Sequence, residues 1–268
     1  MSPRASAPST TASPKDYTPV TELPGLRTTP EALAMAVTRY ALAARHAQGK
    51  EVLEVACGPG MGLGMLAKTA KRVVGGDYTR GLLRHAQRHY QGRVPLVQLD
   101  AHALPFRDAS FDLVLLYEAI YYLEHPEAFL QEARRVLRPG GMLLICSANK
   151  ERPGFVPSSL AVRYYSASEL LPLLAQQGFA CEVFGAFPAT ASKREGMVNL
   201  LRRVAATLNL IPGTLKAREA LKRLFYGRLV PLPQEVSEGD APIAQLVPLT
   251  TNGPNPDYKV LYAIACRT

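Results

Sequence analysis

The chain has no tryptophan, and its four cysteines are never arranged as a C-x-x-C pair. Three of them fall in expected strands, so we expect reduced core residues and predict no metal site; the cysteines are Cys57, Cys146, Cys181 and Cys266. No apolar run approaches the ~20 residues that a membrane-spanning helix needs. Residues 1–16 lack the apolar segment of a secretion signal, which predicts a disordered tail on a cytoplasmic protein.

Acidic residues are scarce as well, with 22 Asp and Glu against 31 Lys and Arg, so the net charge is +9. Much of the excess lies in 193–228, where nine basic residues meet two acidic ones. Two amphipathic helices are expected there, over 196–210 and 214–229. This segment is interpreted as a cap with solvated charges, a site for an anionic substrate, or a peripheral contact with an anionic membrane. No nucleic-acid partner is expected, because aromatic residues do not interleave with the charge.

Apolar residues make up 47% of the chain, which is enough to bury the core of one domain over 17–268. Short apolar runs alternate with amphipathic stretches, and this alternation predicts a parallel sheet covered by helices on both faces. Strands are expected near 51–56, 72–76, 94–99, 111–117, 141–147, 180–187 and 258–266. Helices are expected near 30–46, 60–70, 79–90, 126–137 and 166–178.

A glycine turn directly follows the first of these strands. Gly58 and Gly60 let the backbone approach a ligand closely, and the next helix points its N-terminus at that ligand, as nucleotide-type cofactors require. The spacing departs from the dinucleotide pattern G-x-G-x-x-G/A, because Leu63 stands at the third position. The one formal match, over 62–67, lies inside the expected helix, which disfavours NAD-type cofactors.

Five blocks in order along the chain resemble class I S-adenosylmethionine-dependent methyltransferases of the type 11-like family. They are Glu54-Val-Ala-Cys-Gly58-Pro-Gly60, Val73-Val-Gly-Gly-Asp77, Asp100-Ala101-His-Ala-Leu104-Pro105-Phe106, Phe111-Asp112-Leu-Val-Leu-Leu-Tyr-Glu118 and Arg134-Arg-Val-Leu-Arg-Pro139-Gly140-Gly141. Ala56 stands where the family's first motif has its first glycine. The resemblance covers about 52–187 and a last strand near the C-terminus.

The resemblance implies a Rossmann-like, seven-stranded, mostly parallel sheet whose last strand is antiparallel. The connection between strands six and seven is then a basic helical insertion over 188–256, the segment least like the family. The resemblance also implies S-adenosyl-L-methionine as cofactor and a small-molecule acceptor with an oxygen or nitrogen nucleophile. Anionic and lipid-linked acceptors both remain open.

The resemblance assigns the cofactor to Glu54, Ala56, Gly58, Gly60, Asp77, Tyr78, Asp100, Ala101 and Tyr117. Asp77 would accept hydrogen bonds from the ribose diol, although an Asp here also caps helices. Asp100 would meet the adenine amino group and the Ala101 backbone a ring nitrogen, with a loop-capping Asp as the alternative. Glu54 would meet the charged amino-acid end, since a carboxylate near the core needs a partner.

The acceptor would lie against 117–126, after the fourth strand. Tyr122 and Tyr121 are candidates to orient it, although aromatic packing explains two adjacent tyrosines equally well. Many relatives carry His at the position of Tyr122, so the obvious general base is absent, and His102 is a further candidate. We expect a roof made of 17–30 and the insertion.

Arg163 should point into this pocket together with the two tyrosines. The other histidines have simpler roles: His125 is expected to cap a helix, and His85 and His89 to lie on a solvated helix face. Two other classes stay open for the whole chain. They are a catalytically silent methyltransferase-like binding protein and a nucleotide-cofactor oxidoreductase.

Overall fold

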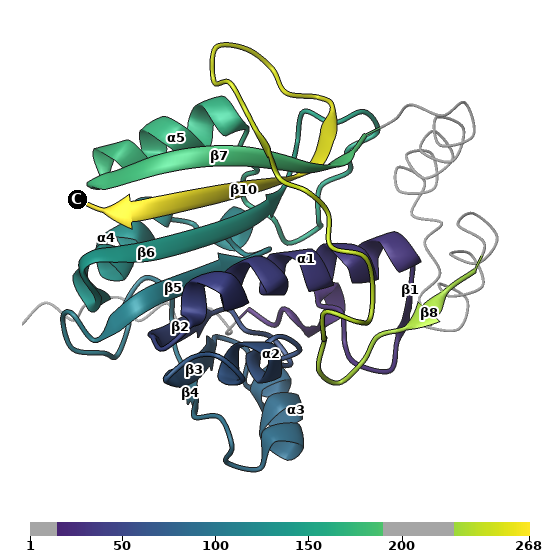
Figure 1. Ribbon diagram of the computed structural model, residues 1–268, viewed down its shortest axis with the longest axis vertical. Helices are drawn as coiled ribbons and strands as arrows, with labels where there is room; N and C mark the ends of the chain where they lie inside the picture. The colour runs from purple at the N-terminus through teal and green to yellow at the C-terminus, as the bar shows by residue number, and fades with distance from the viewer. Residues whose placement is uncertain (1–14, 190–227) are drawn as a thin grey trace, which may run out of the picture.

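The computed structural model describes residues 15–189 and 228–268 (Figure 1). Most of the expected N-terminal tail and of the two basic helices therefore lies outside the described residues. The helices are α1 (Pro30–Ala47), α2 (Leu63–Ala67), α3 (Arg80–Tyr90), α4 (Pro126–Val136) and α5 (Ala167–Gln176), with single 3-10 turns η1 (Thr18–Val20) and η2 (Ile120–Tyr122). The strands are β1 (Arg27–Thr28), β2 (Glu51–Val55), β3 (Arg72–Asp77), β4 (Leu96–Gln98), β5 (Phe111–Tyr117), β6 (Leu137–Ala148), β7 (Phe179–Pro188), β8 (Val230–Pro231), β9 (Val247–Pro248) and β10 (Tyr258–Arg267).

The main sheet has the order β4-β3-β2-β5-β6-β10-β7-β9. Strands β4 to β6 run parallel, and β10 lies antiparallel between β6 and β7. The mostly parallel sheet with an antiparallel last long strand is confirmed. The strand count differs, because the two-residue β9 pairs with the edge of β7 and gives eight strands instead of seven. A segment of two residues carries too little pattern to predict a strand.

Helices cover both faces of the sheet (Figure 1). The helices α1, α2 and α3 pack on one face in a first hydrophobic core, and α4 and α5 pack on the other in a second. Strand β5 lies between the two cores, and five of its seven residues from Leu113 to Tyr117 are buried in succession. Such a continuous apolar run is typical of a parallel strand buried on both sides.

Helix starts follow the expected capping chemistry. The Thr29 side chain accepts a hydrogen bond from the Ala32 amide at 3.1 Å, and Pro30 occupies the first turn of α1. Helix α5 begins with a capping box between Ser166 and Glu169. Helix α2 is shorter than expected, because the turn that begins at the first glycine extends through Gly62.

The described part of the insertion, 228–256, contains no helix. Its residues 229–246, here called the strap, run from β1 past the glycine turn after β2 to α1. Strand β8 in the strap pairs with β1, the Val236 amide donates to the Met61 carbonyl at 2.8 Å, and the Ala244 amide donates to the Thr38 hydroxyl. The strap thus joins the N-terminal segment to the glycine turn. No helix among the described residues is long and apolar enough to cross a membrane.

Candidate functional site

The candidate site lies where the strand order reverses. From β2 the chain proceeds to β3 and β4 on one side, and from β5 to β6 on the other, so the carboxyl ends of β2 and β5 border a crevice. Ala56 directly follows β2 with φ +58°, and Glu118 directly follows β5 with φ +51°. Two left-handed residues that are not glycine flank this crevice, and strain of this kind concentrates at functional sites.

The glycine turn after β2 is held by backbone and side-chain bonds. Gly58 and Gly60 have φ of +57° and +81°, which glycine adopts at little cost. The Tyr90 hydroxyl of α3 donates to the Gly60 carbonyl at 2.7 Å and accepts from the Gly64 amide at 2.8 Å. The Tyr90 side chain of α3 therefore holds the turn in place.

Gly62 and Gly64 have a packing reason to be glycine. A Cβ on Gly62 would lie 1.8 Å from the Tyr40 ring, and one on Gly64 would lie 1.9 Å from the Glu235 carboxylate of the strap. Glu235 also pairs with His89 at 2.6 Å and with Arg93 at 3.0 Å. His89 therefore contacts the strap, whereas a solvated position was expected.

Asp77 closes β3 and is only 5% exposed. Its carboxylate accepts from the Gly58 amide at 2.8 Å and from the Thr79 amide at 2.7 Å, so it connects the loop after β2 to the loop after β3. Burial raises the pKa of Asp77, and these two amide bonds oppose the rise. The N-cap of α3 is Thr79, so Asp77 caps the loop before the helix rather than the helix itself.

Glu54 in β2 is 1% exposed, and one oxygen accepts from the Tyr40 hydroxyl at 2.6 Å. The other oxygen, Oε2, is buried without a hydrogen-bond partner among the described residues. Burial raises the pKa of Glu54 to about 8, against an ordinary value of 4.5. An orphaned buried carboxylate oxygen beside the glycine turn fits a ligand that brings a positive charge or a hydrogen-bond donor.

Asp100 and His102 lie in the loop after β4. The Asp100 carboxylate accepts from the His102 amide at 2.9 Å and lies 2.7 Å from His102 Nδ1. This contact occupies one ring nitrogen of His102, and the other lies 3.4 Å from the His125 amide. Asp100 therefore does cap its own loop, with its side chain still half exposed. His125 sits at the N-cap of α4 without making a side-chain capping bond.

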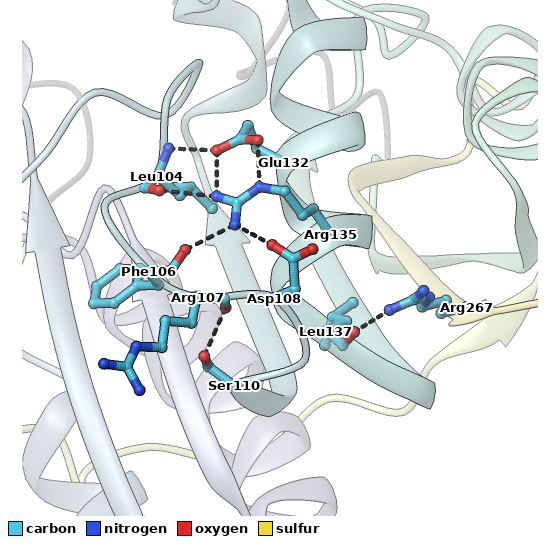
Figure 2. A network of polar contacts seen from close by, with 9 residues as sticks. All are labelled: Leu104, Phe106, Arg107, Asp108, Ser110, Glu132, Arg135, Leu137 and Arg267. Carbon is cyan, nitrogen blue, oxygen red and sulfur yellow. Dashed lines mark hydrogen bonds and ion pairs between the residues drawn. The ribbon is translucent and has the colours of Figure 1, made fainter.

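Arg135 of α4 holds the end of this loop (Figure 2). Its guanidinium donates to the carbonyls of Leu104 and Phe106 at 2.9 and 2.7 Å and to both oxygens of Glu132 at 2.7 Å. Glu132 in turn accepts from the Leu104 amide at 2.7 Å, and Asp108 pairs with Arg135 at 2.8 Å. The network fastens the segment that follows Asp100 and Ala101 to α4.

A tyrosine cluster lies beside the crevice. Tyr121 and Tyr122 in η2 contact each other at 4.6 Å between ring centroids, and Tyr164 stacks on Tyr121 at 4.3 Å. Tyr17 packs against Tyr122 at 5.1 Å and, more loosely, against Tyr78 at 6.4 Å. Tyr17 thus connects the loop after β3 to the tyrosines of η2.

The phenol groups of the cluster are neutral donors. The Tyr121 hydroxyl donates to Glu118 at 2.9 Å, and the Tyr122 hydroxyl donates to Ser158 at 3.1 Å. Burial raises the pKa of both tyrosines, which keeps their protons in place.

Four other residues were expected near the site, and they differ in burial. Tyr117 is buried in the first core, and its hydroxyl donates to the Arg39 carbonyl of α1. Tyr78 is 39% exposed next to Tyr17, and Ala101 is half-buried. The Arg163 guanidinium pairs with Glu169 at 3.1 Å and its side chain is 60% exposed, so its expected position facing the acceptor stays a prediction. Arg163 and Glu169 are six positions apart in the sequence, and no sequence pattern predicted their ion pair.

Sequence reasoning missed Arg39, and it included Glu118 only as one position of the expected lining segment 117–126. Arg39 of α1 lies 3.8 Å from Glu118, and its Nε is buried without a hydrogen-bond partner among the described residues. The pair brings a helix and a strand end together across 79 positions, so no local pattern signals it. Within the described ranges, no three His, Cys, Asp or Glu side chains are grouped as metal ligands would be.

Comparison with known proteins agrees with this geometry. A family model described as a methyltransferase domain matches residues 53–145. A protein of Mycolicibacterium smegmatis named a probable S-adenosylmethionine-dependent methyltransferase is 36% identical over 149 residues, 53% of this chain and 57% of that protein. A fatty-acid O-methyltransferase of the same species is 38% identical over 122 residues, 42% and 44% of the two chains.

Among solved structures, an S-adenosylmethionine-dependent methyltransferase of Mesorhizobium loti matches with a TM-score of 0.53 at 18% identity, over 88% of this chain and all of that one. The sheet order is that of a class I, Rossmann-like methyltransferase fold. Residues 53–145 match the methyltransferase domain model, and about half of the chain is similar to proteins named as probable S-adenosylmethionine-dependent methyltransferases. It spans about half the length of the curated relatives it matches.

Proposed function

We propose that this chain transfers a methyl group from S-adenosyl-L-methionine to a small, largely apolar acceptor. The observation that carries the proposal is the pair of buried carboxylates around the glycine turn. Asp77 is held between the two cofactor loops, and Glu54 has an orphaned buried oxygen. Both are groups that a bound ribose and a bound ammonium would satisfy.

The residues that would hold the cofactor are those at the carboxyl ends of β2, β3 and β4. Glu54 would meet the amino-acid end, Gly58 and Gly60 would give it backbone access, and Asp77 would accept from the ribose. Tyr78 and the loop of Asp100 and Ala101 would hold the adenine, with Ala56 and Tyr117 as supporting positions. S-adenosylmethionine supplies an activated methyl group, so this chain's contribution is alignment of the acceptor and exclusion of water.

The acceptor would lie against the tyrosine cluster, with Tyr121 and Tyr122 as its walls. The packing of Tyr17 on Tyr122 and the strap contact at Met61 support a roofed, mostly apolar pocket. The relative named as a fatty-acid O-methyltransferase supports an acceptor with an apolar chain. His102 is a weaker candidate for a catalytic role, because Asp100 already binds its ring.

Transfer of a radiolabelled methyl group tests the proposal. The wild-type chain should label at least one compound in a panel of alcohols, phenols, amines and fatty acids, and Asp77→Ala should not. Binding of S-adenosylhomocysteine without transfer to any compound would favour the silent binding protein. Binding of NAD(P) in place of S-adenosylhomocysteine would favour the oxidoreductase.

The basic segment 193–228 is proposed to contact anionic lipid surfaces or anionic acceptors. The support is its sequence charge, since nearly all of it lies outside the described residues. Neutralising Arg202, Arg203, Lys222 and Arg223 together should reduce binding to anionic vesicles, with an effect that shrinks as salt rises. Loss of cofactor binding with unchanged vesicle binding would instead indicate a structural cap.

A further inference from the structure

The Glu118 carboxylate borders the crevice, and the proposed cofactor site makes no use of it. Glu118 is the first residue after β5, and its φ of +51° costs a residue with a side chain ~1 kcal/mol or more. A strained backbone conformation persists only where contacts with the surrounding structure stabilise it. We therefore consider the contacts of the Glu118 side chain.

Among the described residues, each polar side chain that contacts this carboxylate is a donor or a cation. Oε2 accepts from the Tyr121 hydroxyl at 2.9 Å. Oε1 accepts from the Cys146 thiol at 3.5 Å and lies 3.8 Å from the Arg39 guanidinium. The Glu118 side chain is still 31% exposed. Its three neighbours therefore fix the orientation of the carboxylate without closing it off from solvent. This is the arrangement of a positioned proton acceptor.

The other candidate bases near the acceptor are already committed. The hydroxyls of Tyr121 and Tyr122 donate their protons to Glu118 and Ser158. His102 is bound by Asp100 on the adenine side of the crevice. Glu118 is the carboxylate that directly contacts the tyrosine cluster.

We propose that Glu118 is the general base of the reaction and that the acceptor is an apolar compound with a weakly acidic hydroxyl. This inference rests on the proposed methyl transfer, and it names the class of acceptor. A base is needed chiefly when the nucleophile is a poorly acidic hydroxyl. An ammonium acceptor is disfavoured, because it would bring a second cation beside Arg39. Tyr121 and Arg39 are positioning residues that orient the carboxylate.

The proton and electrons balance within this arrangement. The acceptor O–H bond breaks, and its proton moves to a Glu118 carboxylate oxygen. The electron pair left on the acceptor oxygen forms the new bond to the methyl carbon, and the pair of the carbon–sulfur bond stays with sulfur in S-adenosylhomocysteine. Glu118 then releases its proton to water.

The test compares Glu118→Gln, Glu118→Asp and a control, Glu127→Gln, which removes an exposed carboxylate at the start of α4. Calorimetry first measures S-adenosylhomocysteine binding, and then 4-hexylphenol binding to that complex. Methyl transfer is measured from pH 5 to pH 9 with 4-hexylphenol, catechol, 1-dodecanol and dodecylamine as acceptors. Circular dichroism confirms that each variant is folded.

We expect Glu118→Gln to keep S-adenosylhomocysteine affinity within about twofold and to bind 4-hexylphenol about tenfold more weakly, since a hydrogen bond to a charged group is lost. Its transfer rate to hydroxyl acceptors should fall by about 10²-fold or more, and the loss of rate at acid pH that we expect of the wild type should be absent. Glu118→Asp should recover part of the rate, and Glu127→Gln should match the wild type.

A Glu118→Gln variant with wild-type rate and pH profile would overturn the role of Glu118. Transfer by the wild type to dodecylamine alone, or to none of the hydroxyl compounds, would overturn the acceptor class. Failure of the wild type to bind S-adenosylhomocysteine would overturn the proposed function itself. The first binding measurement therefore separates the two failures.

Discussion

Glu54→Gln should stabilise the ligand-free protein increasingly as the pH rises. The pKa of Glu54 rises from 4.5 to about 8 on folding, chiefly through burial. For a carboxyl with a raised pKa, the stabilising contribution is complete below pH 4.5 and is lost as the pH climbs toward 8. Integrated between pH 5 and pH 8, this loss amounts to ~3 kcal/mol, an upper limit for a buried group. The neutral Gln does not suffer it.

Urea unfolding at pH 5 and pH 8 measures the unfolding free energy of the wild type, of Glu54→Gln and of a control, Glu182→Gln. Glu182 is an exposed glutamate on β7. The difference in unfolding free energy between wild type and Glu54→Gln should widen with pH, and Glu182→Gln should follow the wild type. The same Glu54→Gln protein should bind S-adenosylhomocysteine about tenfold more weakly, because the orphaned oxygen is lost. If the difference in unfolding free energy between wild type and Glu54→Gln were the same at pH 5 and pH 8, the proposal that Glu54 is a buried carboxylate kept for a ligand would be refuted.

Two further changes test the loops around the site. Ala56→Gly should raise the unfolding free energy by ~0.5 kcal/mol in chemical denaturation, because relief of the left-handed strain exceeds the entropy that glycine adds to the unfolded chain. A lower unfolding free energy would mean that the Ala56 conformation is not strained. Arg135→Lys should lower the unfolding free energy by ~2 kcal/mol, because an ammonium cannot replace the forked bonds to Leu104, Phe106 and Glu132. Its neighbour Arg134→Lys is the control, and equal effects of both would contradict the network.

Local pattern was enough to predict the order of the long strands and the turn that follows β2. Apolar runs ending in Gly58, Asp77 and Asp100 mark the carboxyl ends of parallel strands, and parallel strands place those ends on one edge. The structure confirms that sheet. The sequence also predicted that Asp77 follows an apolar strand, and Asp77 is the last residue of β3. The sequence could not show that the Asp77 carboxylate already accepts hydrogen bonds from two backbone amides.

Contacts between distant segments could not be predicted in the same way. The strap meets the glycine turn through Val236 and Met61, and Arg39 meets Glu118, because tertiary packing brings them together. The left-handed backbone of Glu118 has no local signature, since neither glycine nor asparagine occupies the position. The sequence therefore predicted the β2 and β3 side of the crevice in more detail than the side that follows β5.

We propose that the crevice at β2 and β3 binds S-adenosylmethionine through Asp77. Calorimetric titration of the wild-type chain and of Asp77→Ala with S-adenosylhomocysteine, with NAD as a parallel titrant, tests it most directly. The wild type should bind S-adenosylhomocysteine and not NAD, and Asp77→Ala should bind it at least about tenfold more weakly, because the ribose bonds and the loop contacts are lost together. A folded Asp77→Ala protein with unchanged affinity for S-adenosylhomocysteine would contradict the account.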